Sequence, residues 1–97
     1  MVMTILEAHV TPDHWAELEQ AYRQALQQHE PGLVRTFLAH SKREYDLWRI
    51  LTVWRSQAAL DAMRNSGDRP RGVLIFRQAG AEPMLSVFEI VQQLPPE

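Results

Sequence analysis

The sequence predicts an α+β domain in which helices cover one face of a four-stranded antiparallel sheet. Strand-like and helix-like segments follow one another in the order β-α-β-β-α-β, and short polar or proline-glycine breaks separate them. Segments in this order form a split β-α-β arrangement with right-handed crossovers. We therefore expect residues 1–97 to form a single domain of the ferredoxin-like class.

The first half of the chain predicts a strand, a helix and a second strand. Residues 2–10 carry apolar side chains on both faces, which is typical of a strand covered on two sides. Thr11 and Pro12 suit the N-cap and the first position of a helix, and apolar residues recur at helical spacing as far as Leu26. A proline-glycine pair ends this helix, and residues 33–40 alternate as the second strand.

A strand that runs directly into a helix dominates the second half. A polar connection at 41–44 predicts a hairpin loop, and the third strand follows from Asp46 to Trp54. Ser56 is a good N-cap because its hydroxyl can accept a hydrogen bond from a backbone amide of the first turn. The helix that it begins is expected to end near Asn65.

Two further segments complete the chain after a break at residues 68–72. The apolar run that begins at Val73 is too short for its period to decide between a short helix and a strand fragment. Its continuation to Ala79 without β-branched residues favours a helix, which we consider as a lid over a cavity. Residues 84–92 alternate as the last strand.

Composition excludes several kinds of protein. The formal net charge of −2 gives no support for binding to nucleic acid or to an anionic membrane. There is no cysteine, so disulfides, thiolate metal sites and a cysteine nucleophile are excluded. The N-terminal residues lack the basic and apolar regions of a signal peptide, and no apolar run is long enough for a membrane span. We expect a cytoplasmic protein.

The sheet presents a problem that a second copy of the chain would solve. Helices are expected on one face only, yet every strand has apolar residues on both faces. A contiguous exposed apolar patch usually marks an interface, so we expect a homodimer formed by sheet-on-sheet packing. Trp48 and Trp54 are expected at this interface or at its rim. The residues that cannot all lie against the helices are Met3, Ile5, Phe37, Trp48, Ile50, Phe88 and Ile90.

The segment Ile-Leu-Thr-Val-Trp-Arg-Ser at 50–56, with Ala59 and Leu60 after it, resembles the antibiotic biosynthesis monooxygenase domains. Tyr22, the Pro-Gly-Leu-Val run at 31–34 and the Val-Phe-Glu-Ile-Val run at 87–91 extend the resemblance over nearly the whole chain. The resemblance implies a dimeric α/β barrel with a cavity in each subunit between the sheet and the helices. It also implies that the protein oxidises a polycyclic aromatic or quinol-like molecule with dioxygen, without metal or flavin.

A second branch of the family binds haem and breaks it open, and this sequence departs from that branch. The branch has an asparagine in the first strand and a tryptophan in the second helix, where this chain has Leu6 and Met63. It also has a histidine just beyond that helix, but residues 71–79 contain none. Because an imidazole ligates the iron there, we do not expect haem degradation.

Oxygenation without a cofactor requires a base and a stabiliser of charge in a dry pocket. The candidate catalytic residues are His40, Arg49 and Tyr22, with Arg35 as an alternative to Arg49. The candidate ligand-binding residues are Trp15, Tyr22, Leu6 and Met63, although core packing is the default for the two aromatic residues on the helix. The candidate bases are scattered without metal-ligand spacing, so we expect neither a metal nor another cofactor; they are His9, His14, His29, His40, Glu7 and Glu89.

Two functions remain open from the sequence. The first is a small monooxygenase acting on an aromatic or quinol-like molecule. The second is a dimeric α/β-barrel protein that holds a small apolar or aromatic ligand without turnover. A buried histidine or arginine near a tyrosine or tryptophan would favour the first, and a pocket lined only by apolar and aromatic residues would favour the second.

Overall fold

The computed structural model describes residues 1–28, 30–65 and 71–96. The candidate base His29 and residues 68–70 of the predicted break therefore lie outside the described residues. The elements in chain order are β1 (Val2–His9), η1 (Pro12–His14), α1 (Trp15–Ala25), β2 (Leu33–His40), β3 (Leu47–Trp54), α2 (Gln57–Arg64), α3 (Arg71–Gln78) and β4 (Met84–Glu89).

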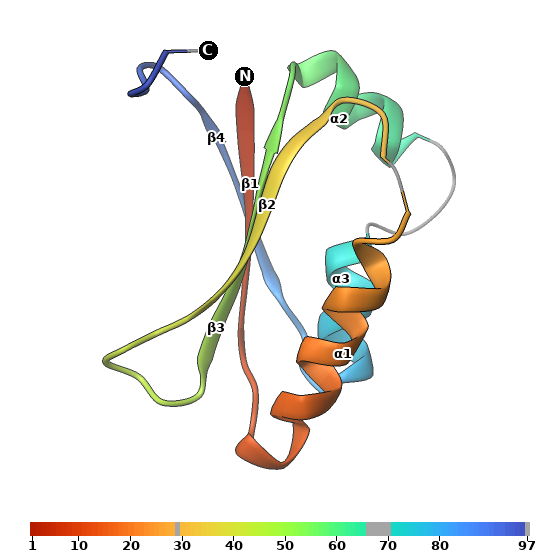
Figure 1. The fold of residues 1–97 in the computed structure, drawn as a ribbon, viewed down its shortest axis with the longest axis vertical. Helices are drawn as coiled ribbons and strands as arrows, with labels where there is room; N and C mark the ends of the chain where they lie inside the picture. Colours follow the sequence, from red (N-terminus) through yellow and green to blue (C-terminus); the bar gives the residue numbers. More distant parts are fainter. Residues whose placement is uncertain (29, 66–70, 97) are drawn as a thin grey trace.

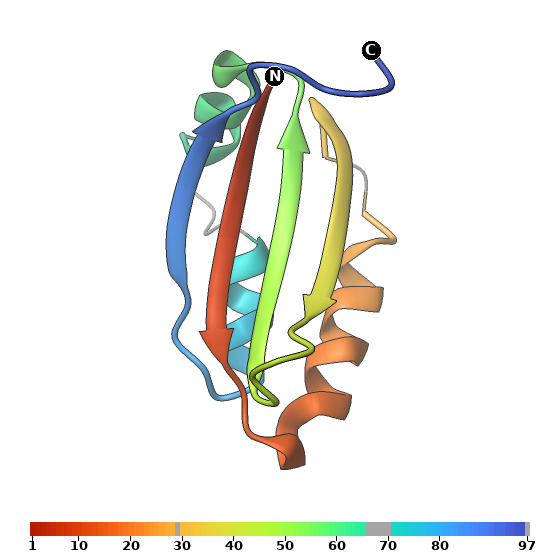
Figure 2. The ribbon, with the colours of Figure 1, turned by 90° about the vertical axis from the view of Figure 1, so that its left-hand side faces the viewer.

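The four strands form one antiparallel sheet in the order β2-β3-β1-β4. Figure 1 shows this sheet strongly twisted, with α1, α2 and α3 all on one side of it. Figure 2 shows the opposite, uncovered face, with β4 and β2 at the two edges. The ferredoxin-like prediction is confirmed, and the undecided segment after the break is a helix, α3.

Local chemistry explains how α2 is placed against the end of β2. The Ser56 hydroxyl accepts a hydrogen bond from the Ala59 amide at 3.1 Å, as predicted for an N-cap. Gly32 has a φ of +82°, a conformation that favours glycine. A Cβ at Gly32 would lie 2.5 Å from the Cβ of Ala59, so glycine also permits this helix to approach the turn.

The helix-side face of the sheet carries a continuous row of buried residues. In β3 these include Trp48 and Ile50, which are only 5% and 4% exposed. The prediction that Trp48 and Trp54 serve the interface or its rim, and that Ile50 belongs to the uncovered patch, is wrong. The register pairs Trp48 with Ala8 and Ile50 with Leu6, and both pairs face the helices.

The apolar core is divided into two clusters. The larger, which we call the α1–α3 core, packs those two helices on the sheet and includes Leu18, Trp48 and Phe76. The smaller, which we call the α2 core, consists of the buried residues Val2, Trp54 and Leu60, with Leu33 and Met63 against them. Figure 1 shows the matching separation, with α2 at one end of the sheet and α1 and α3 at the other.

The uncovered face of the sheet remains apolar. Phe37, Phe88 and Met84 are 49%, 51% and 74% exposed. By the strand register they share this face with Met3, Ile5, Leu51 and Val53. Among the described residues, no helix is long and apolar enough to cross a membrane.

Candidate functional site

A cavity of about 810 Å³ lies between the helix-side face of the sheet and the three α-helices. Its walls come from both clusters of the core, so the cavity occupies the division between them. Most of its lining is aliphatic or aromatic, which is typical of a small-molecule site. The apolar lining residues are Leu6, Tyr22, Ala25, Leu26, Leu33, Ile50, Trp54, Leu60, Met63, Val73, Leu74, Ile75 and Leu85.

A row of threonines crosses the sheet at the floor of this cavity. The register pairs Thr36 of β2 with Thr52 of β3, and Thr52 with Thr4 of β1. All of them line the cavity. The Tyr22 hydroxyl donates to Thr36 Oγ1 at 3.2 Å, and the hydroxyls of Thr36 and Thr52 are also 3.2 Å apart. The indole N–H of Trp54 donates to Thr4 Oγ1 at 3.2 Å.

Charged residues lie at the wall made by the end of α1 and the start of α3. Arg71 forms an ion pair with Glu30 and donates to the backbone oxygens of Ala25 and Gln28, at 3.4 and 2.9 Å. These bonds satisfy carbonyl groups at the end of α1, which no longer have partners within the helix. The contacts connect α3 to α1 beside the cavity.

The structure places three of the four predicted ligand-binding residues in this cavity. Leu6, Tyr22 and Met63 line it. Trp15 is not among its lining residues. Its indole N–H donates to the backbone oxygen of Val10 at 2.8 Å, and its ring packs against the α1–α3 core. Tyr22, which is also a candidate catalytic residue, is the polar member of the three.

His40 lies on the helix side of the sheet but away from the cavity. Its ring stacks on Trp48 with centroids 4.0 Å apart and meets Trp15 edge-on at 4.7 Å. One ring nitrogen lies 2.5 Å from the backbone oxygen of Tyr45. Among the described residues, the indole N–H of Trp48 has no hydrogen-bond partner. The structure therefore puts His40 in an aromatic cluster and does not bring it together with Tyr22.

The two candidate arginines lie on the uncovered face. Arg49 forms an ion pair with Glu7 across the β1–β3 register. Arg35 is paired with Val53 in the register and is exposed. Neither arginine is among the residues that line the cavity.

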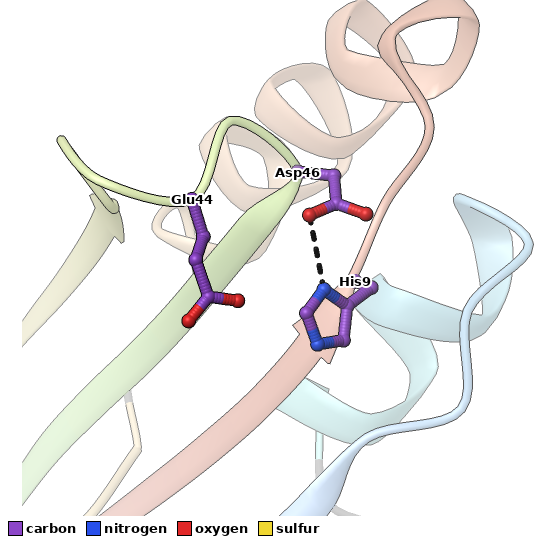
Figure 3. Close-up of side chains that lie close together, drawn as sticks. All are labelled: His9, Glu44 and Asp46. Atoms are coloured by element: carbon purple, nitrogen blue, oxygen red, sulfur yellow. Dashed lines mark hydrogen bonds and ion pairs between the residues drawn. The ribbon is translucent and has the colours of Figure 1, made fainter.

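The uncovered face also holds a cluster of possible metal ligands, which spacing along the chain did not reveal. One ligand atom each from His9, Glu44 and Asp46 lies within 4.8 Å of the others (Figure 3). His9 Nδ1 is 3.0 Å from Asp46 Oδ1, and this hydrogen bond raises the pKa of His9. The cluster is at the far end of the strands from α2, and its residues do not line the cavity.

Sequence reasoning did not identify the threonine row as a site. The sequence holds part of the signal, because Thr4, Thr36 and Thr52 each fall within a predicted strand. What was missing was the register, which alone shows that the three positions are neighbours across three strands.

Comparison with known proteins identifies the family. Residues 1–71 match the sequence profile of the antibiotic biosynthesis monooxygenase family. A search of curated proteins found no match. Similar solved structures include a putative antibiotic biosynthesis monooxygenase from Deinococcus radiodurans, with a TM-score of 0.75 and 14% identity over 100% of this chain and 99% of that one.

Two other similar structures carry named functions. SnoaB from Streptomyces nogalater, described as a cofactor-independent oxygenase, has a TM-score of 0.72 and 19% identity, covering 98% of this chain and 97% of its own. A variant of MhuD with two manganese protoporphyrin IX molecules bound per active site has a TM-score of 0.74 and 19% identity, covering 99% and 100%. At such identities these structures establish the shared fold. With the family match over most of its length, the chain belongs to the antibiotic biosynthesis monooxygenase family.

Proposed function

We propose that the protein is a cofactor-independent monooxygenase whose substrate is a hydroxylated aromatic or quinol-like small molecule. The observation that carries this proposal is the hydroxyl chain from Tyr22 through Thr36 to Thr52 inside an otherwise apolar cavity. Flat rings fit the apolar walls, and the hydroxyl chain provides hydrogen-bond partners for a ring oxygen. The family match and the similarity to SnoaB, a cofactor-independent oxygenase, support the same chemistry.

The reaction balances without any other reductant. A quinol and one dioxygen give a hydroxyquinone and one water. One oxygen atom forms a new C–O bond on the ring, and the other leaves as water with two hydrogens. The substrate supplies all four electrons, and loss of the proton from its hydroxyl makes the ring electron-rich enough to begin the reaction.

A second function, ligand binding without turnover, is favoured by the lack of an evident base among the described residues that line the cavity. None of the described histidines, His9, His14 and His40, lines the cavity. Glu30, which does line it, is occupied by an ion pair with Arg71. The lack of a cavity histidine among the described residues also gives no support to haem ligation.

Oxygen uptake distinguishes the two functions. The purified protein is mixed with a naphthohydroquinone under labelled dioxygen, and the rate is compared with spontaneous oxidation. We expect faster uptake and a product that has gained one labelled oxygen atom and lost two hydrogens. Tyr45→Phe should show the same uptake as the wild type, because Tyr45 is 67% exposed and does not line the cavity. Saturable binding of the naphthohydroquinone, with oxygen uptake no faster than the spontaneous rate, would reject the monooxygenase and support ligand binding without turnover.

We also propose that the protein is a homodimer in which the uncovered faces of two sheets meet. Phe37 and Phe88 are about half exposed on this face and Met84 more so, although all three are large and apolar. An apolar patch on a sheet face that no helix covers is characteristic of an interface. The absence of cysteine agrees with a reducing, cytoplasmic location, which we include in the proposal.

A further inference from the structure

The floor of the cavity contains more O–H donors than the protein's own acceptors use. Tyr22, Thr36 and Thr52 are three hydroxyls joined by two hydrogen bonds, so one O–H remains unused whichever way the chain of bonds runs. Thr4 accepts from the Trp54 indole, which uses a lone pair and leaves the Thr4 O–H unused. The described residues supply no other hydrogen bond to these hydroxyls.

The two unused donors are on neighbouring strands and can converge. Because Tyr22 donates to Thr36, the unused O–H of the chain belongs to Thr36 or to Thr52. It belongs to Thr52 when Thr36 donates to Thr52, the direction that continues the chain of donors from Tyr22 and that the site below requires. Thr52 and Thr4 are direct partners in the β1–β3 register, and they are 9% and 8% exposed. Side chains directly opposite one another on antiparallel strands have Cβ atoms about 4.5–5.5 Å apart. At that spacing, both hydroxyls can donate to one oxygen placed between them.

We propose that Thr4 and Thr52 form a two-donor site for a single ligand oxygen that carries negative charge, the phenolate or enolate oxygen of the substrate. The inference rests on the proposed function, because it takes the cavity as the substrate site. Hydrogen bonds to an ionised acceptor are about twice as strong as neutral ones. Preorganised donors of this kind stabilise charge where it develops.

The two-donor site gives the cavity a preference among ligands that its apolar lining alone cannot provide. A pure hydrocarbon of the same shape would fill the cavity but leave two buried O–H donors without acceptors, which is costly. A phenol binds more favourably, and its ionised form binds best. The site therefore selects for an acidic ring hydroxyl and promotes its ionisation, although no described histidine lines the cavity.

The test is the ionisation of a bound phenol. We would bind 2-naphthol to the protein and follow its ionisation by ultraviolet absorbance as the pH is raised. In the wild type we expect the pKa of bound naphthol to be about 1 unit below that of free naphthol, which corresponds to about tenfold tighter binding of naphtholate than of naphthol.

Thr52→Val is the decisive variant, because it keeps the shape of the side chain and removes the hydroxyl. We expect it to reduce the shift in the pKa of bound naphthol, because only the Thr4 donor remains, and we expect Thr52→Ser to keep the full shift. Thr4→Val is less suitable, since it would leave the Trp54 indole N–H without its acceptor. Thr11→Val is the matched control, because Thr11 is exposed and does not line the cavity.

The inference is overturned if bound naphthol ionises at the same pH as free naphthol, if Thr52→Val retains the full shift, or if naphthol does not bind. Its failure can be told apart from failure of the proposed function, because this titration requires no dioxygen. A lowered pKa without oxygen uptake would support the two-donor site and reject the monooxygenase. Uptake without a lowered pKa would do the reverse.

Discussion

At the scale of single residues, Tyr22 joins α1 to the sheet through one hydroxyl, which donates to Thr36. For Tyr22→Phe we expect affinity for hydroxylated aromatics to fall by about 2- to 10-fold, because the hydroxyl chain loses its first member. We expect the free energy of unfolding to fall by about 1 kcal/mol, a typical value for one hydrogen bond. Calorimetric titration and urea unfolding measure the two effects.

The same substitution at Tyr45 is the control for Tyr22→Phe. Tyr45 lies in the hairpin loop, and its side chain is not among the residues that line the cavity. Tyr45→Phe should leave affinity unchanged. Equal affinities for Tyr22→Phe and the wild type would show that the ligand does not use the hydroxyl chain.

His9 and Asp46 make stability depend on pH. The hydrogen bond that the His9 ring donates to the Asp46 carboxylate raises the pKa of His9 above its ordinary value of 6.5. A raised folded-state pKa stabilises the protein fully below the unfolded-state pKa, and this contribution is lost as the pH rises through the folded-state pKa. We therefore expect Asp46→Asn to reduce stability more at about pH 5.5 than at about pH 9.

Two measurements check the prediction for His9. Its ring protons, followed by NMR, should titrate at lower pH in Asp46→Asn than in the wild type. Urea unfolding at the two pH values gives the difference in stability. An unchanged His9 titration would mean that the hydrogen bond to Asp46 does not control the ring.

Predictions about single residues were correct where neighbouring residues in the chain determine the structure. They failed where the structure depends on how distant segments pack against one another. Ser56 was recognised as an N-cap from its own hydroxyl and the residues after it. Trp48 was placed on the wrong side, because alternation fixes which residues share a face but not which face the helices cover. The meeting of His9 with Asp46 could not be found from spacing, since the two are 37 residues apart.

At the scale of elements, Gly72 sets how closely α3 approaches the sheet. A Cβ at this position would lie 2.4 Å from Leu6 Cδ1. The end of the Leu6 side chain can turn into the cavity, and alanine is the better helix former by about 1 kcal/mol. For Gly72→Ala we therefore expect a change in stability within about 1 kcal/mol, but several-fold weaker ligand binding.

A double variant identifies the cause of weaker binding in Gly72→Ala. If the displaced Leu6 side chain blocks the cavity, Leu6→Ala in the same chain should restore affinity relative to Gly72→Ala alone. Titration calorimetry of the two single variants and the double variant measures this coupling. Unchanged binding by Gly72→Ala would show that α3 can move away from the sheet without altering the cavity.

The elements themselves were predicted with little error. The second strand has the predicted bounds, and the first and third differ from prediction by one residue. The last strand ends at Glu89 and not at residue 92, so its predicted C-terminal end is too long. The spacing of apolar residues could not determine the secondary structure of the segment that forms α3, because an apolar stretch of that length fits either a helix or a strand.

At the scale of the whole molecule, we expect the exposed face of the sheet to hold two chains together. Phe88→Asp places a charge in the apolar patch and should shift the protein from a dimer toward a monomer of 11.2 kDa. Sedimentation analysis measures the mass. Ala58→Asp adds the same charge on α2, which lies on the covered side, and should leave the dimer intact. A wild-type protein that sediments as a monomer would contradict the proposed dimer.

The division of the core into two clusters has a consequence for the protein in a cell. An open cavity between the α1–α3 core and the α2 core means that the empty protein forgoes part of the packing that its interior could provide. A ligand present at 100 times its dissociation constant stabilises the folded state by about 2.7 kcal/mol. Since proteases remove the unfolded fraction, the amount of this protein would rise and fall with the supply of its ligand.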